Sequence, residues 1–206
     1  MKQESTVFVV DDDREVRDAL QLLMESVGLP VETFGSAQEY LDRFDPERPG
    51  CLVLDIRMPG MSGLELQARL NAERIYPPIV IITGHGDVPM AVRAVQAGAV
   101  DFVQKPFNDQ ALLDSVHRAI ERDAQQRGEV SRLRDIEERV RRLTPREREV
   151  MDLVIAGKRN KVIASEMNIS QSTVEAHRAK VMEKMEADTL SSLMRMMLTL
   201  EALQGE

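Results

Sequence analysis

Residues 51–63, CLVLDIRMPGMSG, form a short apolar run that ends on a carboxylate and continues into a turn rich in glycine and proline. The run 51–55 is typical of a buried strand in a parallel sheet, where apolar side chains cover both faces. Carboxylates are seldom tolerated at the edge of a core unless they are paired, hydrogen-bonded or bound to a cation. The turn that follows is too short and too glycine-rich to bury Asp55. We therefore expect Asp55 to lie at the carboxyl edge of a sheet and to face a crevice.

Strand-like and helix-like segments alternate on both sides of this stretch. The apolar residues between the strand-like runs recur at helical spacing, as Val16, Leu20, Leu23 and Val27 do. This alternation predicts an α/β fold, a doubly wound five-stranded parallel sheet. We expect the flavodoxin-like strand order 2-1-3-4-5, which is one of the common orders of such sheets. The expected strands are 6–10, 30–34, 51–55, 78–83 and 100–104.

The charge of the chain indicates two modules. The net charge is −8, of which residues 1–125 carry −9, residues 126–143 carry +2 and residues 144–206 carry −1. After about residue 124 strand-like runs stop, and residues 124–143 place Leu133, Ile136, Val140 and Leu143 at helical steps. We expect a domain over 1–123, an amphipathic helical linker over 124–143 and a small all-α domain over 144–206.

The composition narrows the class of protein. Hydrophobic residues make up 43% and charged residues 30% of the chain, as in ordinary globular proteins. Cys51 is the only cysteine, which excludes an internal disulfide and a cysteine metal cluster. The N-terminus does not resemble a signal peptide and no apolar stretch is long enough to span a membrane, so we expect a cytoplasmic location.

Polar residues follow four of the expected strands. Asp11 and Asp12 follow the first strand, Asp55 ends the third, Thr83 ends the fourth and Lys105 follows the fifth. The strand order brings the three carboxylates into one crevice, where they would repel one another unless a cation such as Mg²⁺ neutralised them. Lysine and threonine suit the oxygens of a phosphoryl group. This arrangement favours a carboxylate nucleophile directed at phosphorus.

These residues, with MPGMSG after Asp55 and the stretch ITGHGDVPMAVRAVQAGAVDF (82–102), resemble the receiver domain of FixJ-type response regulators over residues 5–123. The resemblance implies that Asp55 accepts phosphate from a sensor histidine kinase. It also implies that Mg²⁺ (or Mn²⁺) is bound by Asp12, Asp55 and the backbone carbonyl of Arg57, and by Asp11 through water.

The same resemblance implies roles for three further residues. Thr83 and Lys105 would contact the phosphoryl group, and Thr83 and Phe102 would be the residues that switch on phosphorylation. Apolar residues of the expected fourth helix would then form a dimer interface, namely Val88, Met90, Val92 and Val95.

The last domain contains a helix-turn-helix pattern, with helices expected over 160–167 and 171–185 and a three-residue turn between them. In the second helix Val174, Val181 and Met185 share one face and are expected to be buried. The residues expected to contact DNA are Lys161, Ser172, Thr173, Glu175, Ala176, His177, Arg178, Ala179, Lys180 and Lys184. Of these, Thr173, His177, Lys180 and Lys184 would lie towards phosphates, and the alternative for His177 is a partly buried role in helix packing. Small outward residues would allow close approach to a major groove.

This segment resembles the LuxR/GerE-type output domain in LTPRERE, NKVIASEM and STVEAHRAKVMEKM. Some relatives place lysine where this chain has Glu175. A carboxylate cannot bind phosphate but can accept a hydrogen bond from cytosine N4. The operator of those relatives therefore does not transfer to this chain.

The sequence thus predicts a two-component response regulator of the FixJ/NarL type, in which phosphorylation at Asp55 controls dimerisation and sequence-specific binding to double-stranded DNA. The expected partners are a sensor kinase, DNA, RNA polymerase and a second copy of the chain, with transcriptional activation as the expected output. One alternative is a receiver-containing adaptor whose helical tail binds protein. An aspartyl phosphatase of the haloacid-dehalogenase type is disfavoured, because it needs aspartate where Arg57 stands. We expect no enzymatic activity beyond Mg²⁺-dependent self-phosphorylation and dephosphorylation.

Overall fold

The computed structural model describes residues 4–84 and 88–204, and of these the side chains of Val88, Ala91 and residues 202–204 are left undescribed. Within these residues the chain divides by its contacts into two compact units, Met1–Arg127 and Gly128–Glu206. Each unit has its own apolar clusters. No helix among the described residues is long and apolar enough to cross a membrane.

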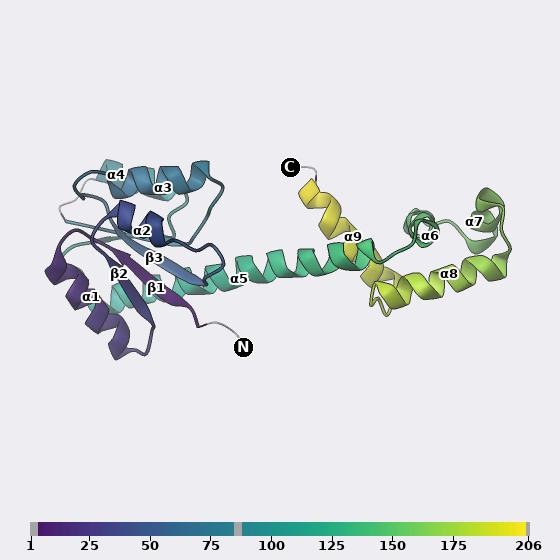
Figure 1. The fold of residues 1–206 in the computed structure, drawn as a ribbon, viewed down its shortest axis with the longest axis horizontal. Coiled ribbons are helices and arrows are strands. Elements are labelled where there is room, and N and C mark those ends of the chain that lie inside the picture. The colour runs from purple at the N-terminus through teal and green to yellow at the C-terminus, as the bar shows by residue number, and fades with distance from the viewer. Residues whose placement is uncertain (1–3, 85–87, 205–206) are drawn as a thin grey trace. The chain divides into compact units, whose positions relative to one another are not determined.

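The first unit is built on a five-stranded parallel sheet of order β2-β1-β3-β4-β5, which confirms the predicted fold. Figure 1 labels the strands β1 to β3 of this sheet and the helices α1 to α4 around it. The strands begin and end within one residue of the predicted positions. They are β1 (Thr6–Val10), β2 (Val31–Phe34), β3 (Gly50–Asp55), β4 (Ile79–Thr83) and β5 (Asp101–Gln104). The three central strands are buried along their whole length, as a sheet covered on both faces requires.

Helices cover both faces of the sheet. The face that carries Phe8 and Phe34, called the aromatic-rich face below, packs against α2 (Ala37–Arg43), α3 (Gly63–Ala72) and α4 (Val88–Gln96). The opposite face packs against α1 (Arg14–Ser26) and the first turns of α5 (Asp109–Arg141). Cys51 is fully buried between α5 and the sheet, as expected for a core residue, and burial raises the pKa of its thiol to about 12.

A buried carboxylate ties α5 to the start of β3. Asp123 accepts a hydrogen bond from the amide of Gly50 at 2.9 Å and forms an ion pair with Arg127. Arg127 also donates to the carbonyls of Pro46 and Arg48, at 2.8 and 2.6 Å. These contacts satisfy the backbone groups of the loop that leads into the strand carrying Asp55.

The second unit is helical. Besides the end of α5 it contains α6 (Pro145–Ile155), α7 (Asn160–Met167), α8 (Gln171–Lys184) and α9 (Leu190–Gln204). The predicted linker residues Leu133, Ile136, Val140 and Leu143 belong to the apolar cluster of this unit, together with residues of α6, α8 and α9. The apolar side of this amphipathic helix therefore packs into the core of the second unit.

Candidate functional site

The carboxyl edge of the sheet brings together Asp11, Asp55 and Lys105. Asp11 follows β1 and is 1% exposed, whereas Asp55 ends β3 and is 5% exposed. Nζ of Lys105 lies 2.6 Å from Oδ2 of Asp11 and 2.8 Å from Oδ1 of Asp55. One ammonium thus joins the ends of three strands, as the strand order predicted. Residues more than 90 positions apart meet here because parallel strands place their carboxyl ends at one edge.

Backbone groups hold the remaining oxygens of the two carboxylates. The amide of Arg57 donates to Oδ2 of Asp55 at 2.6 Å, and the amide of Asp13 donates to Oδ1 of Asp11 at 2.9 Å. The amide of Lys105 donates to the carbonyl of Thr83 at 2.7 Å, and the side chain of Thr83 is buried. The Lys105–Pro106 peptide is cis. The threonine and the lysine are therefore fixed next to each other by the backbone.

The environment of the site shifts the pKa values of Asp55 and Lys105. Burial raises the pKa of Asp55, and the neighbouring charge of Asp11 adds to this, although hydrogen bonds from Lys105 and the Arg57 amide offset part of it. Burial would lower the pKa of Lys105, but its contacts with Asp11 and Asp55 raise it overall. Asp11, Asp55 and Lys105 therefore form one largely buried charge cluster.

Asp12 stands apart from this cluster. It is exposed, and within the described residues its carboxylate has no hydrogen bond or ion pair. No group of three or more His, Cys, Asp or Glu side chains among the described residues is arranged to hold a metal ion. Lys105 thus joins Asp11 and Asp55, and Asp12 follows Asp11 in the sequence without a contact of its carboxylate among the described residues. The pair still fits Mg²⁺ chemically, because two buried like charges with hard oxygen atoms favour a cation.

Arg17 supports the acidic turn and is a residue that the sequence analysis missed. Its Nη1 donates to the carbonyls of Asp11 and Asp12 at 2.7 and 2.9 Å. The only signal in the sequence is the position of Arg17 in the first helix, five and six residues after Asp12 and Asp11. Gly63 is also required here, because a Cβ atom at this position would lie 2.1 Å from the carbonyl oxygen of Asp55.

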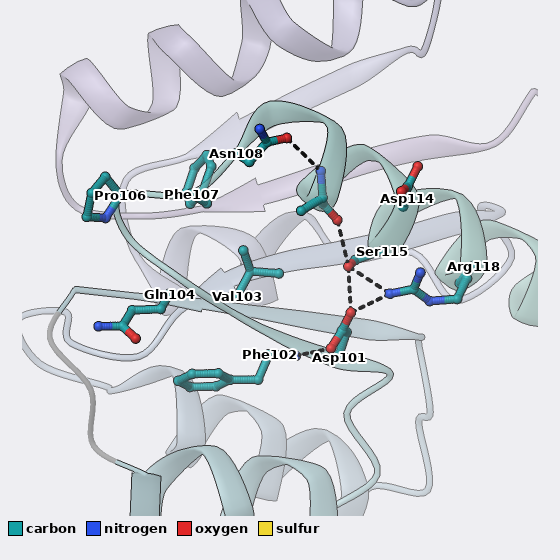
Figure 2. Close-up of a pocket in the computed structure, with 11 residues that line it drawn as sticks. Asp101, Phe102, Val103, Gln104, Pro106, Phe107, Asn108, Asp114, Ser115 and Arg118 are labelled. Carbon is teal, nitrogen blue, oxygen red and sulfur yellow. Dashed lines mark hydrogen bonds and ion pairs between the residues drawn. The ribbon is translucent and has the colours of Figure 1, made fainter.

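An open pocket of about 470 Å³ lies along β5 and the start of α5 (Figure 2). On its floor Asp101 accepts hydrogen bonds from Ser115 and Arg118 of α5. Burial raises the pKa of Asp101, but these bonds and the amide of Phe102 lower it overall. The expected switch residue Phe102 is partly buried against the aromatic-rich core cluster.

The expected dimer residues of α4 divide into three groups. Val92 and Val95 are 49% and 52% exposed, as an interface in a free subunit requires. Met90 is partly buried and packs against the core cluster, so less of it is available to a partner. The side chain of Val88 lies outside those described.

The second unit contains the predicted helix-turn-helix. α7 has the predicted bounds, Asn168 takes the left-handed conformation with φ of 54°, and Ser170 caps α8 by accepting from the amide of Thr173. α8 ends at Lys184, one residue before the predicted position. The predicted buried stripe Val174, Val181 and Met185 is confirmed, with exposures of 0%, 2% and 0%.

Most of the expected DNA-contact residues are exposed. They are Lys161, Ser172, Thr173, Glu175, Ala176, Ala179 and Lys180. His177 and Arg178 are half-buried, and Nδ1 of His177 is buried without a hydrogen-bond partner among the described residues. This burial favours the helix-packing role of the two that were open for His177.

Lys184 differs from its expectation. Its ammonium lies 2.6 Å from Oε2 of Glu147, a residue of α6 that is 3% exposed. Glu147 also accepts from the amide of Thr144 at 2.8 Å in a capping box. From its helical position, Lys184 was expected to point towards the DNA phosphates. In the structure it instead binds the buried carboxylate of Glu147, which lies 37 positions earlier in the sequence. The threonine and glutamate of LTPRERE carry the capping-box signal that could have identified Glu147.

Comparisons with known proteins agree with both halves. Residues 7–117 match the response regulator receiver domain, and residues 141–197 match the bacterial regulatory proteins of the luxR family. The chain is 48% identical over 197 residues to nodulation protein W of Bradyrhizobium diazoefficiens, covering 96% of this chain and 87% of that protein. It is 45% identical over 196 residues to the transcriptional regulatory protein FixJ of the same organism, covering 95% and 96%.

A solved structure supports the same assignment. The response regulator StyR superposes with a TM-score of 0.87 at 46% identity, covering 94% of this chain and 98% of that chain. The luxR-family match disfavours the adaptor alternative, because it places a DNA-binding family at the position of the helical tail. Both halves and the whole length lead to one conclusion. The chain belongs to the response regulators that join a receiver domain to a LuxR-family DNA-binding domain and regulate transcription.

Proposed function

We propose that Asp55 is the phosphoacceptor of this response regulator and that a sensor histidine kinase is its donor. The observation that carries the proposal is the Asp11–Lys105–Asp55 cluster at the carboxyl edge of the sheet. A carboxylate oxygen of Asp55 would attack the phosphorus of a phosphohistidine, forming an O–P bond as the P–N bond breaks and the imidazole leaves. Lys105 and Thr83 would then contact the phosphoryl oxygens.

Asp11 and Asp55, with Asp12 and the carbonyl of Arg57, would hold Mg²⁺. When bound, this ion supplies positive charge that offsets repulsion between the carboxylates and the incoming phosphoryl group. Burial raises the pKa of Asp55, and the hydrogen bond from Lys105 opposes this by favouring the carboxylate form that acts as the nucleophile. This chemistry is stoichiometric, and we propose no further enzymatic activity.

The phosphorylation proposal can be tested by replacing Asp55 with asparagine in the full chain. Asp55→Asn should lose base-labile acyl phosphate formation from an acyl-phosphate donor in the presence of Mg²⁺, while the fold is retained. Asp13→Asn is the matched control, because Asp13 is exposed and its carboxylate caps α1. Undiminished labelling of Asp55→Asn would refute the assignment.

We further propose that phosphorylation acts through Thr83 and Phe102 on the α4 surface, where Val92 and Val95 would contact a second copy of the chain. Dimerisation would strengthen DNA binding, because two modules on two half-sites act at a high effective concentration. The expected output is activation of transcription with RNA polymerase in the cytoplasm.

We propose that the exposed residues of α8 form the DNA-reading face. Ser172, Glu175, Ala176 and Ala179 would face the bases, and Lys180 with Lys161 would contact phosphates. Lys180→Ala should weaken binding to all duplexes alike and lower the salt slope by about 0.9 in log–log units. Glu175→Gln should instead relax preference at one base pair. A Lys180→Ala effect confined to one sequence would contradict this division.

A further inference from the structure

Asn160, the first residue of α7, lies between two α8 side chains of opposite charge. Nη1 of Arg178 donates to Oδ1 of Asn160 at 2.7 Å, and Nδ2 of Asn160 lies 3.5 Å from Oε1 of Glu175. Asn160 and Arg178 are half-buried, whereas Glu175 is exposed. A single amide group therefore joins the two helices of the helix-turn-helix through one acceptor and one donor.

The two neighbours determine which way the amide points. A guanidinium can only donate and an ionised carboxylate can only accept. Rotating the amide of Asn160 by half a turn would place its NH₂ group against Arg178 and its oxygen against Glu175, so both contacts would be repulsive. The observed orientation is the one that both charged neighbours favour.

The contact affects two side chains that lie on one side of α8. Glu175 and Arg178 are three residues apart, which makes them neighbours on a helix surface. Asn160 draws the guanidinium of Arg178 towards α7. Within the described part of the chain, Asn160 engages Oε1 of Glu175, and Oε2 has no hydrogen-bond donor there.

We propose that Asn160 is a positioning residue that determines which α8 side chain reads a base, an inference that rests on the DNA-reading face proposed above. By holding Arg178, Asn160 withdraws a guanidinium that would otherwise pair with O6 and N7 of guanine. By donating to Glu175, it orients the carboxylate as an acceptor for N4 of cytosine. The specificity of α8 therefore depends on a residue of the preceding helix.

The test uses the phosphorylated full chain and a randomised pool of duplex DNA, with bound sequences counted at two salt concentrations. Asn160→Ala should reduce discrimination roughly 2- to 10-fold, the value of one hydrogen bond, at the base pair that Glu175→Gln also affects. It should also add a preference for guanine, because Arg178 is released. Asn160→Asp should lose the cytosine preference by repelling Glu175 but gain no guanine preference, because it still holds Arg178.

Two further variants separate positioning from stability. The double variant Asn160→Ala/Arg178→Met should lack the new guanine preference, and Ser165→Ala, an exposed change on the same helix, should leave base preference as in the wild type. A uniform loss of affinity in Asn160→Ala, with base preference and salt slope unchanged, would overturn the inference while leaving the reading face intact. If Glu175→Gln itself left base preference unchanged, the proposed reading face would fail and the inference with it.

Discussion

Replacing Lys184 with methionine should destabilise the DNA-binding unit, because it leaves the buried carboxylate of Glu147 without its cation. Glu147 is 4% exposed at its side chain and Lys184 is 33% exposed. Methionine keeps most of the apolar stem of lysine and removes only the charge and its hydrogen bond. The change therefore isolates the ion pair between α6 and α8.

The expected loss of stability in Lys184→Met can be worked out from the pKa of Glu147. The hydrogen bond from Lys184, followed by that from the Thr144 amide, lowers the pKa of Glu147 from 4.5 to about 2 against the effect of burial. A shift of this size corresponds to about 3 kcal/mol of stability at neutral pH. Part of this comes from Thr144, and water screens the one-third exposed lysine, so we assign about 1–2 kcal/mol to Lys184.

The same shift fixes the pH dependence. Because the pKa of Glu147 is lower in the folded chain, its contribution is complete above about pH 4.5 and is lost as the pH falls towards about 2. The stability difference between the wild type and Glu147→Gln should therefore be largest at neutral pH. At pH 3 it should fall below half of its neutral value.

Amide hydrogen exchange of the full chain, followed by mass spectrometry, measures this locally. Peptides from α6 and α8 should exchange about 5- to 30-fold faster in Lys184→Met, since a tenfold change corresponds to about 1.4 kcal/mol. Lys180→Met is the matched control, because Lys180 is exposed on the same helix and should change exchange little. Equal exchange in the two variants, or a Glu147→Gln deficit that persists unchanged at pH 3, would refute the reasoning.

Three other perturbations test the receiver domain. Val92→Glu should block phosphorylation-dependent dimerisation in sedimentation experiments without preventing phosphorylation, because Val92 is 49% exposed on α4; an unaffected dimer would place the interface elsewhere. Gly63→Ala should lower the urea midpoint of the receiver, because the new Cβ would lie 2.1 Å from the Asp55 carbonyl oxygen; a wild-type midpoint would show that the turn can relax. Asp12→Ala should weaken Mg²⁺ binding by the full chain, and unaltered Mg²⁺ affinity would remove Asp12 from the ligands.

The elements of both domains could be predicted from local patterns. Buried apolar runs identified the strands of the receiver, and the seven- and four-residue spacing of Val174, Val181 and Met185 identified the buried face of α8. Polar residues at successive strand ends led to Asp11, Asp55 and Lys105, since the carboxyl ends of parallel strands share an edge. In each case the residue spacing reflects the geometry of a strand or a helix, so these features can be predicted from a single sequence.

Partners distant in sequence were decided only by the tertiary structure. Periodicity places Lys184 on a face of α8, but it contains no information that a buried Glu147 of α6 lies 2.6 Å away. In the same way, the sequence separates Asn160 from Arg178 by 18 positions, and only the crossing of α7 and α8 brings them within 2.7 Å. A helical pattern specifies the direction in which a side chain points, whereas its hydrogen-bond partner depends on how two helices pack, and that packing is set by apolar contacts elsewhere in the unit.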